Sequence, residues 1–279
     1  MPQRPARDGD PPLRAGPSGA RPLTAGWATD LAILRHTGSQ IDDRGDHLVV
    51  RTPRNPTFHW GNFVLVTEPA AADDAERWHT AFTGEFPAAT HVALGLPRLP
   101  LAEPYLRLGL DVGTDEVLTT TTLPEQRPLS GPYAARPFAG AADWSALLAV
   151  NILENRWEGT HPVDEHAEFL RAQQRLRQEM VGAGLAQWFG AVDADGTLAA
   201  YLGIVVCGEL GRYQAVGTPP AHRRRGLAGH LLGLAARWAY ERGVSEWVIV
   251  TETVNPAGRL YRGVGFVPDA VQVSAYRHA

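Results

Sequence analysis

The hydrophobic positions of this chain recur with two different periods, and both periods occur in two separate stretches. The spacing of Trp78, Phe82 and Phe86 places three aromatic side chains on one face of a helix. Short, mostly apolar runs such as residues 91–96 are typical of buried strands. In a first unit, residues 24–124, we expect helices over 26–36 and 71–86 and strands over 47–50, 63–66, 91–96 and 116–121.

The second unit, residues 137–279, has a clearer rhythm. Its predicted order is β-α-α-β-β-β-α-β-α-β, and Asp143 is suited to cap the first helix. The expected elements cover 133–138, 143–155, 165–182, 187–192, 198–207, 212–218, 226–242, 247–251, 256–264 and 266–276. Antiparallel strands followed by a βαβα segment predict a mixed, mostly antiparallel sheet flanked by helices. The fold class is therefore α/β (α+β), with a second, smaller α/β domain at the N-terminus.

Two segments are rich in proline. Residues 1–23 contain six prolines and few apolar residues, so we expect a disordered tail. Residues 125–136 contain Pro128, Gly131 and Pro132, and we expect a linker there.

The composition of the chain argues against several classes of function. The net charge of −4 gives no general attraction to nucleic acid or to an anionic membrane. The chain has no lysine, which excludes a Schiff-base lysine. Cys207 is the single cysteine, so no intrachain disulfide forms, and its apolar strand indicates a packed thiol. No apolar run is long enough to span a membrane and no secretory signal is recognised, so we expect a cytoplasmic protein.

The segment from Arg223 to Gly229 lies between a predicted strand and a long amphipathic helix. Its small residues allow a ligand to approach the backbone, and the first amides of the helix have no intrahelical partner. These amides lie at the positive end of the helix dipole, and three arginines add donors for phosphate. The segment predicts an anion site, with a diphosphate as a suitable ligand. It is neither a Walker loop nor a Rossmann fingerprint, because both spacings are absent.

With these residues the chain resembles the GNAT superfamily of N-acetyltransferases. The family motif Arg/Gln-x-x-Gly-x-Gly/Ala matches Arg223, Gly226 and Ala228. Its later helix with Leu-Tyr followed by Gly-Phe matches Leu260-Tyr261 and Gly265-Phe266. The resemblance covers about 135–279, and the first unit, which lacks the loop motif, is either a degenerate tandem copy or an unrelated lid.

The resemblance implies acetyl-CoA as cofactor and assigns its contacts. The backbone of the strand before the loop would bond the pantetheine arm, and the loop amides would bind the pyrophosphate. The implied cofactor-binding set is Val216, Gly217, Thr218, Arg223, Arg224, Arg225, Gly226, Leu227, Ala228, Gly229 and Asn255. Asn255 is displaced by one position from the family's usual asparagine, which aligns with Val254.

The resemblance also implies the catalytic groups. Tyr261 would act as general acid toward the leaving thiolate. No acidic residue lies within 212–216, where some family members keep a general base. Glu209 and Glu252 are the candidates for this role, and a water relay is the alternative.

Other residues carry competing interpretations. The spacing of His161, Glu165 and His166 is not that of a metal-binding helix face, so we expect no metal site. His222 is next to the loop, and either phosphate contact or plain exposure fits it. The pair Trp60 and Asn62 fits either a pocket wall or an aromatic strand edge.

The sequence therefore predicts an N-acetyltransferase that moves an acetyl group from acetyl-CoA to a primary amine by direct attack. The acceptor is a small-molecule or peptide amine, held between the two units. We expect a monomer or homodimer without nucleic-acid or membrane partners. The alternative is a non-catalytic acyl-CoA-binding sensor or regulatory protein.

Overall fold

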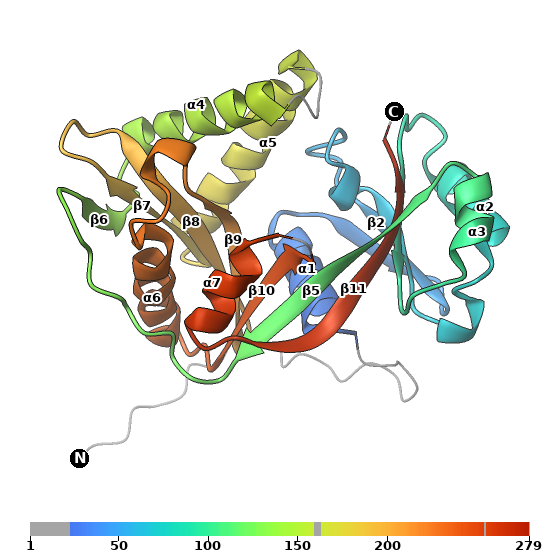
Figure 1. Cartoon of the computed structure of the whole chain (residues 1–279). Helices are drawn as coiled ribbons and strands as arrows, with labels where there is room; N and C mark the ends of the chain where they lie inside the picture. Colours follow the sequence, from blue (N-terminus) through green and yellow to red (C-terminus); the bar gives the residue numbers. More distant parts are fainter. Residues whose placement is uncertain (1–22, 159–162, 254, 279) are drawn as a thin grey trace, which may run out of the picture.

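A computed structural model describes residues 23–158, 163–253 and 255–278. Eleven strands form one sheet in the order β1-β2-β3-β4-β11-β5-β10-β9-β8-β7-β6 (Figure 1). The strands are β1 Gln40–Asp43, β2 His47–Arg51, β3 Phe63–Val66, β4 Val92–Leu96, β5 Asp111–Thr120, β6 Ala134–Pro137, β7 Ala186–Val192, β8 Leu198–Cys207, β9 Leu210–Gly217, β10 Glu246–Glu252 and β11 Val267–Arg277. The α+β class predicted from the sequence is confirmed.

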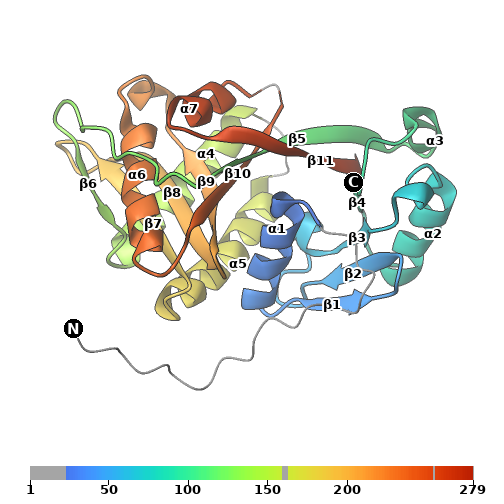
Figure 2. The same ribbon diagram turned by 90° about the horizontal axis from the view of Figure 1, so that it is seen from below.

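Helices cover both faces of this sheet. They are α1 Ala25–His36, α2 Ala75–Glu85, α3 Ala102–Arg107, α4 Ala141–Glu158, α5 Val163–Gly182, α6 Leu227–Tyr240 and α7 Ala257–Gly263, with short 3-10 turns η1 His59–Gly61, η2 Pro69–Ala71 and η3 Pro220–His222. In the C-terminal half, Trp188 packs with α4 and α5, whereas its neighbour Phe189 packs with α6. The alternation of β7 therefore places the helix pair α4–α5 and the helix α6 on opposite faces. In the N-terminal half, α1 and α2 lie on opposite sides of β2–β4 (Figure 2).

The two halves exchange a strand at the centre of the sheet. Strand β5 from the N-terminal half lies between β10 and β11, and it is antiparallel to both. Strand β11 from the C-terminal end lies between β5 and β4, again antiparallel to both. Each half thus completes the sheet of the other, and β5 and β11 cross the molecule side by side (Figures 1 and 2).

The N-terminal half repeats the arrangement of the C-terminal half. In the first, β3 and β4 are parallel neighbours and are connected through η2 and α2. In the second, β9 and β10 are parallel neighbours and are connected through η3 and α6. This correspondence supports the tandem-copy interpretation over that of an unrelated lid.

The predicted element order of the second unit, β-α-α-β-β-β-α-β-α-β, is confirmed from β6 to β11. Strand β1 and helix α3 were not predicted, and β5 begins at Asp111, five residues before the predicted strand. The early part of β5 is polar because it lines a cavity between the halves, described below. Asp143 lies inside α4; its carboxylate accepts from the Ala139 amide at 2.8 Å and pairs with Arg136 at 2.7 Å.

The expected linker is an irregular segment up to β6, and part of it lies against α6. The His230 ring bonds the Arg127 carbonyl at 2.6 Å, and a Cβ on Gly233 would stand 2.3 Å from the Gln126 Cα. The expected disordered tail lies outside the described residues except for Leu23, which packs against the N-terminal core. Among the described helices, none is long and apolar enough to cross a membrane.

Candidate active site

Strands β9 and β10 separate halfway along their length. They pair only where Leu210–Arg212 lies beside Glu246–Val248. Ala215 has a left-handed φ of 49°, and the β8–β9 register shifts between Tyr201 and Gly203, which marks a bulge in β9. Beyond Arg212, the edges of β9 and β10 that face each other make no ladder bonds, so their backbone groups are free to bind an extended ligand.

Val216 and Gly217 end β9 on this open side, and Thr218 follows directly. A Cβ on Gly217 would lie 2.2 Å from Cζ of Tyr201, whose ring covers the strand from β8. Glycine is required at this position for that contact. The predicted pantetheine residues therefore lie together at the mouth of the opening between β9 and β10.

The segment from Arg223 to Gly229 forms the start of α6. Arg224 and Gly226 both adopt left-handed φ values, 62° and 78°. In the described structure, the amides from Arg224 to Gly229 donate to no acceptor, whereas the His230 amide is the first to bond, to the Gly226 carbonyl at 3.1 Å. Residues in alternating conformations with free amides form an anion-binding concavity, or nest, and the helix dipole adds to it.

The three arginines of this loop are exposed, and no described carboxylate lies within ion-pair distance of them. Arg223 is fixed through its Nε, which donates to the Thr218 carbonyl at 2.9 Å. The Arg225 guanidinium lies 6.0 Å from the Tyr133 ring, whose hydroxyl contacts His222 at 3.2 Å. His222 is thus part of the wall beside the loop, and the uncompensated positive charge of the arginines favours an anionic ligand.

Tyr261 lies on α7 and is 5% exposed, packed in the core beneath α6. Its hydroxyl makes no hydrogen bond to any described residue. Burial raises the pKa of Tyr261 to about 12, so the phenol keeps its proton at neutral pH. Asn255 is exposed, and its side chain accepts from the Ala257 amide at 2.9 Å, so it caps the start of α7.

A cavity of about 570 Å³ opens between the two halves, beside the free edges of β9 and β10. Its floor is the sheet face formed by β9, β10, β5 and β11, and its walls come from α1, α5 and η1. The lining residues are Trp27, Asp30, Ile33, Leu34, Phe58, Trp60, Phe63, Asp111, Val112, Gly113, Asp115, Gln173, Arg212, Gln214, Val250, Thr251, Glu252, Gln272, Ser274 and Tyr276.

The structure separates the two candidate bases. Glu252 ends β10 and lines the cavity. Glu209 lies in the exposed turn before β9, where its carbonyl accepts from the Ser245 amide at 2.9 Å. This turn is at the opposite end of β9 from Gly217, so the structure does not place Glu209 at the site.

Sequence reasoning missed the carboxylate nearest to Glu252. Asp115 lies directly opposite Glu252 in the antiparallel pairing of β5 with β10. Burial, with the charges of Glu252 and Asp30, raises the pKa of Asp115. No local pattern could identify Asp115, because it reaches the second half only through the exchanged strand.

Trp60 lines the cavity as one interpretation predicted, whereas the Asn62 side chain donates to the Asn55 and Phe58 carbonyls of its own loop.

Other candidates remain outside this site. Within the described residues, no group of three or more potential ligands is arranged to hold a metal ion. His161 and the side chain of Glu165 lie outside the described residues, and the His166 ring contacts Phe169 at 5.7 Å. Burial raises the pKa of the Cys207 thiol to about 12, consistent with a packed, unreactive side chain.

Comparison with solved structures shows the same fold in proteins of low sequence identity. A GCN5-related N-acetyltransferase from Kribbella flavida matches with a TM-score of 0.64 at 16% identity, over 92% of this chain and 96% of that one. A tandem GNAT protein from the clavulanic acid biosynthesis pathway matches with a TM-score of 0.55 at 15% identity, over 94% of this chain and 90% of that one. A protein of unknown function from Staphylococcus epidermidis matches with a TM-score of 0.62 at 12% identity, over 86% and 94%. No curated protein matches the sequence.

The comparison with protein families points to the same part of the chain as the opening between β9 and β10 and the loop before α6. The acetyltransferase (GNAT) family matches residues 149–266, a range that includes the end of β9, the start of α6 and Tyr261. This chain therefore carries an acetyltransferase domain of the GNAT family, within a fold like that of tandem GNAT proteins.

Proposed function

We propose that this protein transfers the acetyl group of acetyl-CoA to a primary amine by direct attack. The observation that carries the proposal is the start of α6, where six consecutive amides, from Arg224 to Gly229, are unpartnered beside three unpaired arginines. A diphosphate needs several donors and positive charge at one place, and this loop offers both. The free edge of β9 from Val216 to Thr218 continues from the loop toward the cavity and suits the pantetheine arm.

The residues of the chain also suit the chemistry. Acetyl-CoA supplies an activated thioester, and an amine must lose its proton before it attacks the carbonyl carbon. As the C–N bond forms and the C–S bond breaks, the departing thiolate takes up a proton. Tyr261 suits this role because its buried phenol stays protonated at neutral pH and its hydroxyl has no competing partner among the described residues.

Calorimetry and thiol release test the proposal together. We expect acetyl-CoA to bind, and free thiol to appear when an acceptable amine is added. Failure to bind acetyl-CoA would overturn the proposal. Binding without thiol release across a broad amine panel would support the alternative, a non-catalytic acyl-CoA sensor.

Replacement of Tyr261 by phenylalanine tests the general acid. Tyr261→Phe is expected to lower kcat by about 10²-fold, the usual size of general acid catalysis, with an unchanged Kd for acetyl-CoA. Tyr213→Phe is the matched control: it also removes a buried hydroxyl, one that donates to the Leu232 carbonyl at 2.8 Å, outside the site. Equal kcat values for the wild type and Tyr261→Phe would remove Tyr261 from the mechanism.

A further inference from the structure

The cavity between the halves has a floor with an unusual row of three polar side chains, two of which are carboxylates. Glu252 of β10, Asp115 of β5 and Gln272 of β11 are direct neighbours across three strands. Residues opposite each other in antiparallel pairs project from the same face, so their side chains stand together on the cavity floor. Two carboxylates in direct opposition destabilise a sheet unless something compensates them, which indicates a functional reason for the pair.

The cation of the cavity compensates this pair only in part: the charge of Arg212 opposes the rise in the pKa of Asp115, but burial, Glu252 and Asp30 outweigh it. Arg212 is the cation that lines the cavity, and its guanidinium is 3.0 Å from the Asp30 carboxylate. Asp30 is further fixed by the side-chain amide of Gln272 at 2.9 Å. Arg212 and Asp30 therefore neutralise each other.

Asp111, Asp115 and Glu252 are left as three carboxylates on the cavity lining. No described residue pairs with them or donates a hydrogen bond to their side chains. The cavity thus carries an excess of negative charge that a cationic ligand would balance.

The wall of the cavity adds a second, independent feature. Trp60 and Tyr276 stack with ring centroids 5.7 Å apart, and Trp27 lies 6.2 Å from Trp60. Such rings attract ammonium groups to their faces and bury methylene chains. Trp27 is 4% exposed and Gln272 is 8% exposed; both line the cavity, and the Trp27 indole nitrogen and the Gln272 carbonyl oxygen have no hydrogen-bond partner. The site therefore combines negative charge, aromatic surface and unused polar atoms.

We propose that the acceptor is a small polycation, an organic amine that carries at least two ammonium groups. This inference rests on the proposed function and adds the class of its acceptor. A monoamine would leave at least two of the three carboxylates uncompensated. A volume of about 570 Å³ can hold a ligand larger than one alkylammonium chain the size of a lysine side chain. It also lies in the usual range of small-molecule sites. One amino group would face the opening between β9 and β10, while the others would be held by Asp115, Glu252 and the aromatic wall.

A matched pair of acceptors tests this inference on the full chain. With acetyl-CoA saturating, 1,6-diaminohexane is expected to react with a kcat/KM at least about 10-fold above that of n-hexylamine, since one added charge contact contributes on the order of 1.4 kcal/mol. Spermidine and an aminoglycoside, kanamycin, then distinguish the two sources of polycations, an aliphatic polyamine and an amino sugar. Preference for either supports the inference, whereas equal use of n-hexylamine and 1,6-diaminohexane overturns it.

Variants locate the effect. Asp115→Asn and Glu252→Gln are each expected to raise KM for the better polycation about 10-fold or more, and to leave the Kd of acetyl-CoA unchanged. Glu246→Gln, at the other end of β10 and outside the cavity lining, is the control. Both cavity variants remove repulsion between like charges, so their thermal stability should equal or exceed that of the wild type.

The two proposals fail in different ways. Absence of acetyl-CoA binding removes the proposed function. Normal acetyl-CoA binding and thiol release, with KM for polycations unaffected by Asp115→Asn and Glu252→Gln, removes only the assignment of the acceptor. If thiol release is absent, calorimetric titration with spermidine still tests the site, because Glu252→Gln should weaken that binding.

Discussion

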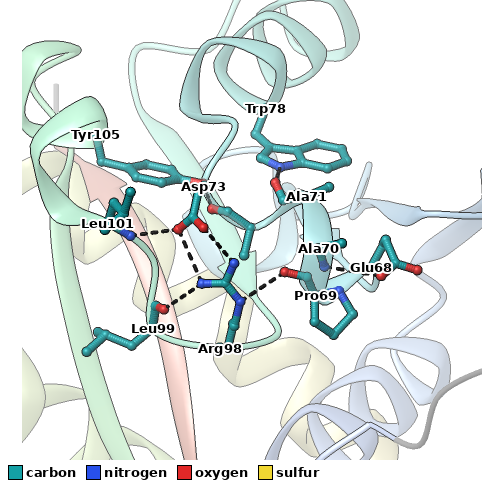
Figure 3. Close-up of polar contacts among 11 residues, drawn as sticks. Glu68, Pro69, Ala70, Ala71, Asp73, Trp78, Arg98, Leu99, Leu101 and Tyr105 are labelled. Atoms are coloured by element: carbon teal, nitrogen blue, oxygen red, sulfur yellow. Dashed lines mark hydrogen bonds and ion pairs between the residues drawn. The ribbon is translucent and has the colours of Figure 1, made fainter.

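The two halves of the molecule build the same junction of strand and helix, but they complete it differently. After β3, residues 67–71 contain a proline-initiated 3-10 turn that leads to α2; after β9, residues 218–222 contain one that leads to α6. In the N-terminal half, the chain's own side chains fill this junction (Figure 3). In the C-terminal half the corresponding groups are unpartnered. The comparison shows how the two junctions differ: one is filled by its own side chains, and the other keeps free amides beside exposed arginines.

The start of α2 is closed by carboxylates. Asp74 caps the helix by accepting from the Arg77 amide at 3.3 Å. Asp73 accepts from the Leu101 amide at 2.7 Å and pairs with Arg98 at 2.6 Å, contacts seen together in Figure 3. Where α6 has arginines and a run of free amides, α2 has two aspartates, and the Asp74, Ala75 and Arg77 amides already have acceptors. An incoming phosphate would therefore meet like charge and few free donors.

The Arg98 side chain links Asp73 to the backbone of the neighbouring segments. Arg98 also donates to the carbonyls of Pro69 and Leu99, each at 3.0 Å (Figure 3). Tyr105 donates to the Ala72 carbonyl at 2.7 Å and the Trp78 indole donates to Ala71 at 2.6 Å. The N-terminal junction is thus held by its own side chains. Among the described residues, the start of α6 is where a run of free helix amides lies beside unpaired arginines.

The largest expected effect comes from separating the two halves. Residues 134–279 expressed alone should not give a stable fold, because β10 and β11 would both lack β5 and would expose open edges. Far-UV circular dichroism and size-exclusion chromatography measure this. Coexpression with residues 23–121 should restore the fold. A folded, acetyl-CoA-binding fragment 134–279 would show that the halves are independent.

The second prediction places a carboxylate at the start of α6, as the N-terminal half does at α2. Gly226→Glu is expected to weaken acetyl-CoA binding by about 10²-fold or more. The added carboxylate would occupy the space beside the free amides and repel the phosphates. Gly243→Glu is the matched control: its φ is also left-handed, 90° against 78°, its Cβ also meets open space, and it lies past the other end of α6. Calorimetry with acetyl-CoA separates them, and equal affinities would refute the phosphate site.

A smaller effect is expected from a single arginine. Arg225→Gln should weaken acetyl-CoA binding about 3- to 10-fold and reduce the dependence of affinity on salt, because the guanidinium is exposed and screened. Arg237→Gln, in the last turn of the same helix, serves as control. An unchanged affinity at low ionic strength would show that the amides bind the phosphates without Arg225.

The smallest functional effect is expected in the N-terminal junction. Asp73→Asn should lower Tm by a few degrees without changing the Kd of acetyl-CoA, since it removes the Arg98 pair and leaves α6 untouched. Glu103→Gln, which breaks an exposed pair with Arg107 within α3, should lower Tm less.

The stability contributed by Asp73 also has a defined pH range. The Arg98 hydrogen bonds lower the pKa of Asp73, so the contribution is present above its unfolded pKa of about 3.9 and is lost as pH falls through the folded value. Thermal melts of the wild type and Asp73→Asn should therefore converge below about pH 4. A change in acetyl-CoA affinity on Asp73→Asn would instead indicate a cofactor site in the N-terminal half.

The sequence by itself predicted the elements and the loop that we propose as the donor site. The element order from β6 to β11 and the loop at Arg223–Gly229 follow from local rules: periodicity, glycine placement and the unpaired amides at a helix start. The role of Tyr261 was implied by the resemblance to the GNAT family. These features depend on residues close together in the chain. The absence of the loop motif from the first unit can also be read from the sequence, because the motif is local.

Only the tertiary structure brought together the residues that we propose for the acceptor site. Asp115, Glu252 and Gln272 lie far apart in the chain and meet because β5 and β11 exchange between the halves. Glu209 and Glu252 were both candidates for the general base in the sequence. The direction of β9 and β10 in the sheet separates them, because Glu209 precedes β9 and Glu252 ends β10. Strand pairing over long sequence distances depends on the summed packing of the whole sheet, so no local pattern contains it.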